Sequence, residues 1–118
     1  MLHDGHGRTA RLRPRDPDAV RNRVRGPNQW RGLDTAVLHD VLLDQQWAVP
    51  EERVSYHHTL DQALARARAD AGVAVELAPV DPAAVLALAA DGVRMPRKST
   101  SFGPKPRTGL VIRAFDEA

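Results

Sequence analysis

The chain contains no cysteine, which excludes disulfides, thiolate metal sites and a cysteine nucleophile. This composition fits a reducing compartment and predicts a cytoplasmic protein. No apolar run approaches the roughly 20 residues that a membrane-spanning helix needs, so no membrane partner is expected. Residues 1–5 also lack the apolar core of a secretory signal.

Aromatic residues are scarce at 4%, although 42% of the chain is hydrophobic. The core is therefore expected to consist mainly of Leu, Val and Ala. The scarcity also argues against a stacking platform for single-stranded nucleic acid. The length of 118 residues predicts a single domain, 1–118, with residues 1–7 disordered because they are polar and contain two glycines.

Several catalytic motifs are missing. The chain has no His-Glu-x-x-His motif, no Gly-x-Ser-x-Gly elbow, no Walker loop and no dinucleotide fingerprint. His3 and His6 lie in the segment that is expected to be disordered, without further ligands nearby. The sequence therefore predicts no metal site.

Charge is segregated along the chain. Residues 1–31 hold eight Arg against three Asp, residues 32–92 three Arg against ten acids, and residues 93–118 six Lys or Arg against two acids. Chain termini often lie close together, so the two basic ends could form one surface that attracts phosphate, nucleotide or nucleic acid. The alternative is a domain held together partly by its own opposite charges.

The hydrophobic pattern alternates between strand and helix periods. Helices are expected at 17–25, 33–47, 60–71 and 83–90, and strands at 8–13, 53–58, 73–78 and 109–115. The strand at 73–78 is nearly all apolar and is expected to be central. This order predicts an α+β (mixed α/β) fold in which helices pack on a mixed four-stranded sheet, with a long basic loop before the last strand.

Two histidines are candidate catalytic residues. His39 lies beside the apolar stripe of the helix 33–47, and His58 ends the strand 53–58. His39 could act as a base, or it could be a boundary histidine with a local hydrogen bond. His57 or His58 could face a cleft. Adjacent His57 and His58 would point to opposite faces of a strand and could not chelate one ion together.

The loop 94–108 combines basic side chains, hydroxyls, glycines and prolines without a carboxylate. Lysines and arginines supply charge for an anion, hydroxyls donate hydrogen bonds, glycines let backbone N–H groups approach, and prolines stiffen the segment. A loop of about fifteen residues is also longer than compact domains usually carry. The loop is the candidate functional site, and the alternative is an exposed connector between a helix and a strand.

The stretch 95–111 reads MPRKSTSFGPKPRTGLV. It resembles the signature near the C-terminus of the family catalogued as domain of unknown function 1015, which is often described as SpoOJ/ParA/ParB/repB-like. Leu33-Asp34, Val54-Ser55-Tyr56 with His58, and the strand leading to Pro79 support the resemblance. The chain departs from the family where Ser101 and Gly103 surround Phe102, and relatives are much longer. The chain therefore resembles only the C-terminal portion of that architecture.

The wider ParB-like group includes nucleotide-dependent DNA-partition proteins and kinases that act on free serine. The resemblance implies a phosphate- or nucleotide-binding fragment of a phosphotransferase of kinase type, whose cofactor would be a nucleotide with Mg²⁺. Its other partners would be a phosphorylated small molecule and either the missing N-terminal half or a second copy. The implied ligand residues are Arg97, Lys98, Ser99, Thr100, Lys105, Arg107 and Gly109. The alternatives are a nucleic-acid-binding ParB-like module and an inactive truncated remnant.

Overall fold

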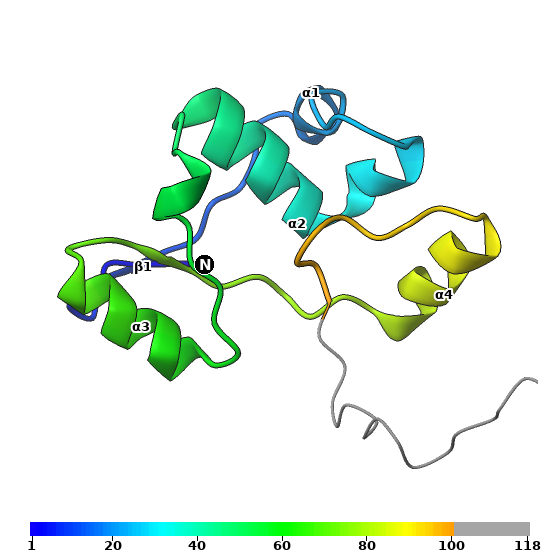
Figure 1. Ribbon diagram of the computed structural model, residues 1–118. Helices are drawn as coiled ribbons and strands as arrows, with labels where there is room; N and C mark the ends of the chain where they lie inside the picture. The colour runs from blue at the N-terminus through cyan, green and yellow to red at the C-terminus, as the bar shows by residue number, and fades with distance from the viewer. Residues whose placement is uncertain (101–118) are drawn as a thin grey trace, which may run out of the picture.

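A computed structural model describes residues 1–100, and residues 101–118 lie outside the description. The described part is mixed α+β. A small sheet with one covering helix, α3, occupies one side of the molecule, and a group of helices occupies the other (Figure 1). Helix α4 lies at the far edge from α3 and precedes the segment that leads out of the described region.

The sheet has three antiparallel strands in the order β2-β1-β3. The central strand β1 (Leu2–His3) pairs with β2 (Thr9–Ala10) on one side and β3 (Ala74–Val75) on the other. Beside β3, the His3 Nε2 atom lies 3.1 Å from the Glu76 Oε2 atom. The β1–β3 pairing thus joins the beginning of the chain to a segment more than seventy residues away.

The prediction of a mixed four-stranded sheet is wrong. Within residues 1–100 the sheet has three strands, all antiparallel, and β3 is an edge strand instead of a central one. The segment 53–58 forms no strand, because only Val54 is half-buried while residues 55–58 are exposed and offer no apolar face to bury. Residues 1–7, expected to be disordered, contain the central strand. The predicted last strand, 109–115, lies outside the described residues.

The helices begin where the sequence predicts them. α1 (Pro17–Arg21) is capped by Asp16, whose carboxylate accepts hydrogen bonds from the backbone N–H groups of Asp18 and Ala19, each at 3.0 Å. α3 (Leu60–Ala69) is capped by the Thr59 hydroxyl, and α4 (Pro82–Ala90) by Asp81. Side-chain caps and proline in the first turn are local signals, so they can be read from the sequence.

The predicted helix 33–47 is confirmed, but most of it has an unusual form. A short 3₁₀ turn, η1 (Asn28–Gly32), leads into α2 (Asp34–Ala36), which continues as the π-helix η2 (Val37–Gln46). The backbone N–H of Trp47 bonds the carbonyl of Leu42, five residues back, at 2.9 Å. π-Helical turns are rare and occur frequently at functional sites. A second 3₁₀ turn, η3 (Glu51–Arg53), follows.

The core lies among the helices. Its buried members are Val24, Leu33, Ala36, Val41 and Leu88. All are Leu, Val or Ala, as the low aromatic content predicts. Trp30 and Met95 pack against this cluster from the segments before α2 and after α4. Among residues 1–100, no helix is long and apolar enough to cross a membrane.

Gly5 fits closely against α3 and provides a test of the packing between the sheet and this helix. The residue has φ +76°, and a Cβ there would lie 2.9 Å from the Arg68 Cγ atom and 3.0 Å from the Arg68 backbone nitrogen. Arg68 also donates a hydrogen bond from Nε to the Gly5 carbonyl.

We expect Gly5→Ala to lower the free energy of unfolding by more than the about 1–2 kcal/mol that a left-handed alanine costs. Gly7→Ala is the matched control, because Gly7 has φ +96° but no atom of residues 1–100 lies within 4 Å of the added Cβ. Equal losses in urea denaturation would contradict close packing at Gly5.

The turn between β1 and β2 predicts an acid-sensitive contact. The Asp4 carboxylate accepts hydrogen bonds from the backbone N–H groups of His6 at 2.8 Å and Arg8 at 3.0 Å. The hydrogen bond from His6 is the main cause that lowers the pKa of Asp4 below its usual value. A lowered pKa in the folded state contributes stability above the unfolded-state value of about 3.9, and this is lost as the pH falls. The melting temperature of the wild type should therefore fall more between pH 5 and pH 3 than that of Asp4→Asn. Parallel pH profiles would show that Asp4 contributes nothing.

Candidate functional site

A cleft of about 470 Å³ lies between η2 and the segment that follows α4. Its walls come mainly from η2, from the stretch 49–56 that follows it, and from the segment after α4, which is distant in sequence. η2 contributes His39, Asp40 and Asp44, the stretch 49–56 contributes Glu51 and Tyr56, and the segment after α4 contributes Pro96 and Arg97. The cleft brings the first residues of the predicted loop, 94–108, against the predicted catalytic candidate His39.

The loop segment is attached to the helical core through Trp30. The indole Nε1 of Trp30 donates a hydrogen bond to the carbonyl of Arg94 at 2.8 Å. Gly26 lies beneath the indole, where a Cβ would approach the Trp30 Cε3 atom to 2.8 Å, so a larger residue would displace the ring. Pro96, two residues after Arg94, is buried. These contacts determine where the chain passes along the rim of the cleft.

Lys98 occupies the next turn in a left-handed conformation, with φ +58°. The Ser99 hydroxyl donates to the Pro96 carbonyl at 2.6 Å and closes this turn. The Lys98 Nζ atom lies 5.7 Å from the centre of the Tyr56 ring. An exposed cation–π contact contributes about 0.5–1 kcal/mol, while a left-handed lysine costs about 1–2 kcal/mol. The Tyr56 contact and the hydrogen bond of Ser99 both act against this backbone strain.

Tyr56 connects Lys98 to His39. The rings of His39 and Tyr56 stack with centroids 5.8 Å apart and an interplanar angle of 24°. Lys98, Tyr56 and His39 thus form a row of one cation and two flat rings along the cleft. Each comes from a different segment of the chain. The arrangement combines a positive charge with a stacking surface, which are two features that a nucleotide requires.

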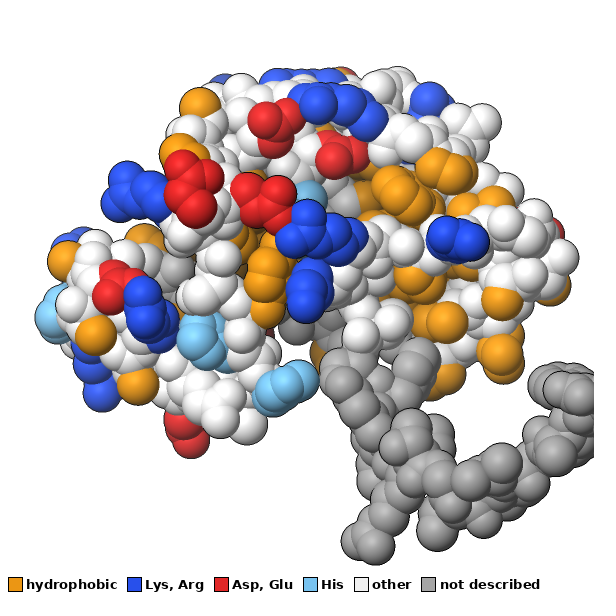
Figure 2. All heavy atoms as spheres, in the orientation of Figure 1, with side chains coloured by type: hydrophobic (Ala, Val, Ile, Leu, Met, Phe, Trp, Pro, Cys, Tyr) orange, Lys and Arg blue, Asp and Glu red, His pale blue; other side chains and the backbone are white. Residues whose placement is uncertain are grey.

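The carboxylates of the cleft are already paired with cations or donors. The Asp40 carboxylate accepts from the backbone N–H of Arg25 at 2.8 Å, and the Arg25 guanidinium pairs with Asp44. Glu51 pairs with Arg97. Within the described part of the chain, no carboxylate lies within salt-bridge distance of Lys98. Figure 2 shows acidic and basic side chains lying next to one another on the face turned to the viewer. Of the two cations at this rim, Arg97 is therefore paired with a carboxylate, whereas Lys98 has no carboxylate partner among residues 1–100.

The structure places the predicted site residues unequally. His39 and Arg97 line the cleft, and Lys98 extends over Tyr56 at its edge. Ser99 uses its hydroxyl within the turn, and Thr100 is exposed as the last described residue. His58 is exposed and does not line the cleft. The remaining predicted ligands, which are Lys105, Arg107 and Gly109, lie outside the described residues.

Sequence reasoning did not identify Tyr56, Asp40 or Glu51 as cleft residues. The spacing of Asp40 and Asp44 on the predicted helix could have indicated that both lie on one face. Tyr56 carried no such signal, because it was assigned to a strand that does not form. In residues 1–100, no group of three or more His, Asp or Glu side chains is arranged to hold a metal ion.

Comparison with protein-family models, curated proteins and solved structures returns no match for this chain. The resemblance of the stretch 95–111 to the domain of unknown function 1015 family thus stays a prediction.

The hydrogen bond between Trp30 and Arg94 can be tested with Trp30→Phe, which keeps an aromatic ring but removes the indole donor. We expect the free energy of unfolding to fall by about 0.5–1.5 kcal/mol, the usual net value of one hydrogen bond. Trp47→Phe is the control, because Trp47 is 42% exposed and makes no side-chain hydrogen bond to residues 1–100. Each variant keeps one tryptophan for fluorescence-monitored denaturation. If the two variants lose equal stability, the Trp30 indole does not hold the loop segment.

Proposed function

We propose that the protein binds a nucleotide or a similar phosphate-bearing ligand at the rim of the cleft, with the Lys98 ammonium as its principal cationic contact. The observation that carries this proposal is the row of Lys98, Tyr56 and His39. A phosphate group would approach the ammonium from solvent, and an aromatic base would stack near the two rings.

The size of the cleft and the exposed position of Lys98 at its rim support a ligand of this kind. Its volume of about 470 Å³ lies within the range of about 300–1,000 Å³ that small-molecule sites occupy. The Lys98 side chain is exposed, so an anion can reach it without a conformational change. Arg97 would be a second contact only if the ligand competed with Glu51 for its guanidinium, because the two side chains already form an ion pair. Arg97 is therefore expected to contribute less than Lys98.

The proposed activity of the longer architecture is phosphoryl transfer of kinase type in the cytoplasm. In the described part of the chain, Asp40, Asp44 and Glu51 are all engaged with Arg25 or Arg97. Asp44 and Glu51 would have to exchange an arginine partner in order to act as a general base or to bind a metal ion. The catalytic carboxylates would come from an N-terminal half or a second copy, and this chain would supply nucleotide binding.

A nucleic-acid-binding module is the second candidate, and one observation favours it. The segment 8–15 is exposed throughout and carries four arginines that form no ion pair within residues 1–100. Binding through these arginines would involve phosphates and would weaken steeply with salt. Nucleotide binding at the cleft would instead depend on Lys98 and would not require the segment 8–15.

The proposed function predicts that Lys98→Ala weakens ATP binding by about tenfold or more, because charge-assisted hydrogen bonds contribute about 1.5–3 kcal/mol. Arg15→Ala, an exposed cation in the segment 8–15, should leave the affinity unchanged. Lys98→Gly should lose the same affinity while raising the free energy of unfolding, because glycine adopts φ +58° without strain. Isothermal titration calorimetry and urea denaturation measure the two effects.

Inorganic triphosphate is the comparison ligand. Wild-type protein should bind ATP more tightly than triphosphate, and Tyr56→Ala should remove that difference by deleting the stacking surface. Wild-type protein that binds no ATP at millimolar concentration, or Lys98→Ala with unchanged affinity, would exclude the proposed site. If Arg15→Ala weakens binding instead, the nucleic-acid module is favoured. Absence of binding to nucleotide and nucleic acid alike would favour the inactive remnant.

A further inference from the structure

Helix α4 is apolar on every side. Its residues, Pro82–Ala90, read PAAVLALAA and include no polar or charged side chain. A helix that is hydrophobic all round is normally buried. Only Leu88 of α4 is buried, however, and Leu86 is 71% exposed. In the described structure the outer face of α4 is therefore uncovered.

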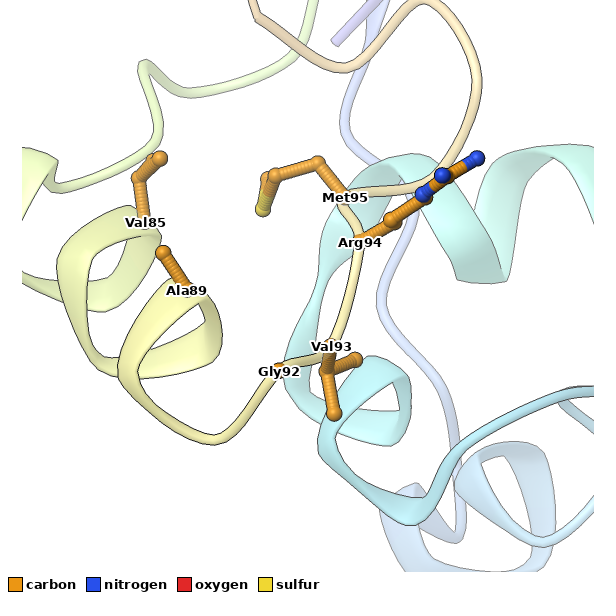
Figure 3. A pocket seen from close by; sticks show the side chains of 6 residues that line it. All are labelled: Val85, Ala89, Gly92, Val93, Arg94 and Met95. Atoms are coloured by element: carbon orange, nitrogen blue, oxygen red, sulfur yellow. The ribbon is translucent and has the colours of Figure 1, made fainter.

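An open groove runs between α4 and the segment that follows it. The groove has a volume of about 360 Å³ and is lined by Val85, Ala89, Gly92, Val93, Arg94 and Met95. In Figure 3 the Met95 side chain extends toward Val85 and Ala89, whereas Arg94 points away from them. Figure 2 shows hydrophobic side chains exposed over this part of the molecule. The groove and the face of α4 beside it form one apolar surface.

We propose that the apolar run 110–115 of this same chain covers the groove and the exposed face of α4. The run reads LVIRAF, with five apolar residues of six and no carboxylate. Such a run is itself prone to aggregation if it stays in water. Contact between the run and the groove would therefore remove the apolar surface of both from water.

The length of the intervening chain permits this contact. Met95 lines the groove, and the described chain continues from there only to Thr100. Nine residues, 101–109, separate Thr100 from the run and can span at most about 30 Å. α4 has nine residues, which correspond to a length of about 13–14 Å. The linker can therefore span more than the length of α4, which permits the run to lie along this helix.

Charge and connectivity favour the chain's own segment over a second copy. The single charge of the run is Arg113, and the C-cap of α4 is the exposed acid Asp91. A segment joined by a short linker is present at an effective concentration of about millimolar, so a second copy competes only at comparable protein concentration. The contact would hold the segment 101–109, with its predicted ligands Lys105 and Arg107, at both ends.

The absence of cysteine allows a direct test by disulfide formation in the full chain. Leu86→Cys is combined with Ile112→Cys in one variant and with Val111→Cys in another, because neighbouring residues of an extended segment point to opposite sides. Under mild oxidation, at least one variant should form an intrachain disulfide at least about tenfold faster than the control. Ala65→Cys with Ile112→Cys is that control, since Ala65 is an exposed position of α3, away from the groove. Mass spectrometry of digested, non-reduced protein identifies the linkage.

Two results would overturn the proposal. Crosslinking of both variants at the rate of the control would show that the run does not occupy the groove. Rapid formation of disulfide-linked dimers by the single variant Leu86→Cys would show that a second copy covers α4. The readout requires no nucleotide, so it remains informative whether or not the proposed function holds.

Discussion

The attachment of the segment after α4 to Trp30 is the constraint on which the candidate site depends. The indole N–H of Trp30 bonds the Arg94 carbonyl, and the ring in turn requires a glycine at position 26. Together with the packing of Met95 and the burial of Pro96, this contact determines where Arg97 and Lys98 lie relative to η2. The hydrogen bond connects residues more than sixty positions apart in the sequence. It leads the chain to the place where Lys98 lies over the Tyr56 ring.

Local sequence signals predicted the helices but not the sheet. Asp16 with Pro17, and Asp81 with Pro82, are start signals that act within a few residues, so their helices could be located directly. The sheet depends instead on pairing between Leu2 and Val75, which no local pattern specifies. Its strands are two residues long, too short for an alternating pattern to be recognised. Val54 and Tyr56 matched a strand by propensity, but the segment 53–58 supplied no buried face.

The cations of the candidate site could be predicted from the sequence, but their partners could not. The composition of the loop indicated an anion site, and Lys98 lies where a ligand could reach it. The partners of Lys98 could not be predicted, because Tyr56 reaches it only through the path of the chain after η3. The pairing of Glu51 with Arg97 likewise follows from tertiary structure. It distinguishes the two cations, because Arg97 has a carboxylate partner whereas Lys98 has none among residues 1–100.

The π-helix η2 has a further consequence for the cleft wall. Each of its backbone hydrogen bonds joins residues five positions apart, one more than in an α-helix. Deletion of a single residue from η2 would let the segment return to α-helical register without loss of the helix itself. His39, Asp40 and Asp44 would then face new directions, and Arg25 and Tyr56 would lose their present partners. One small deletion could therefore redirect several side chains of the cleft wall at once, which substitutions made one by one do not do.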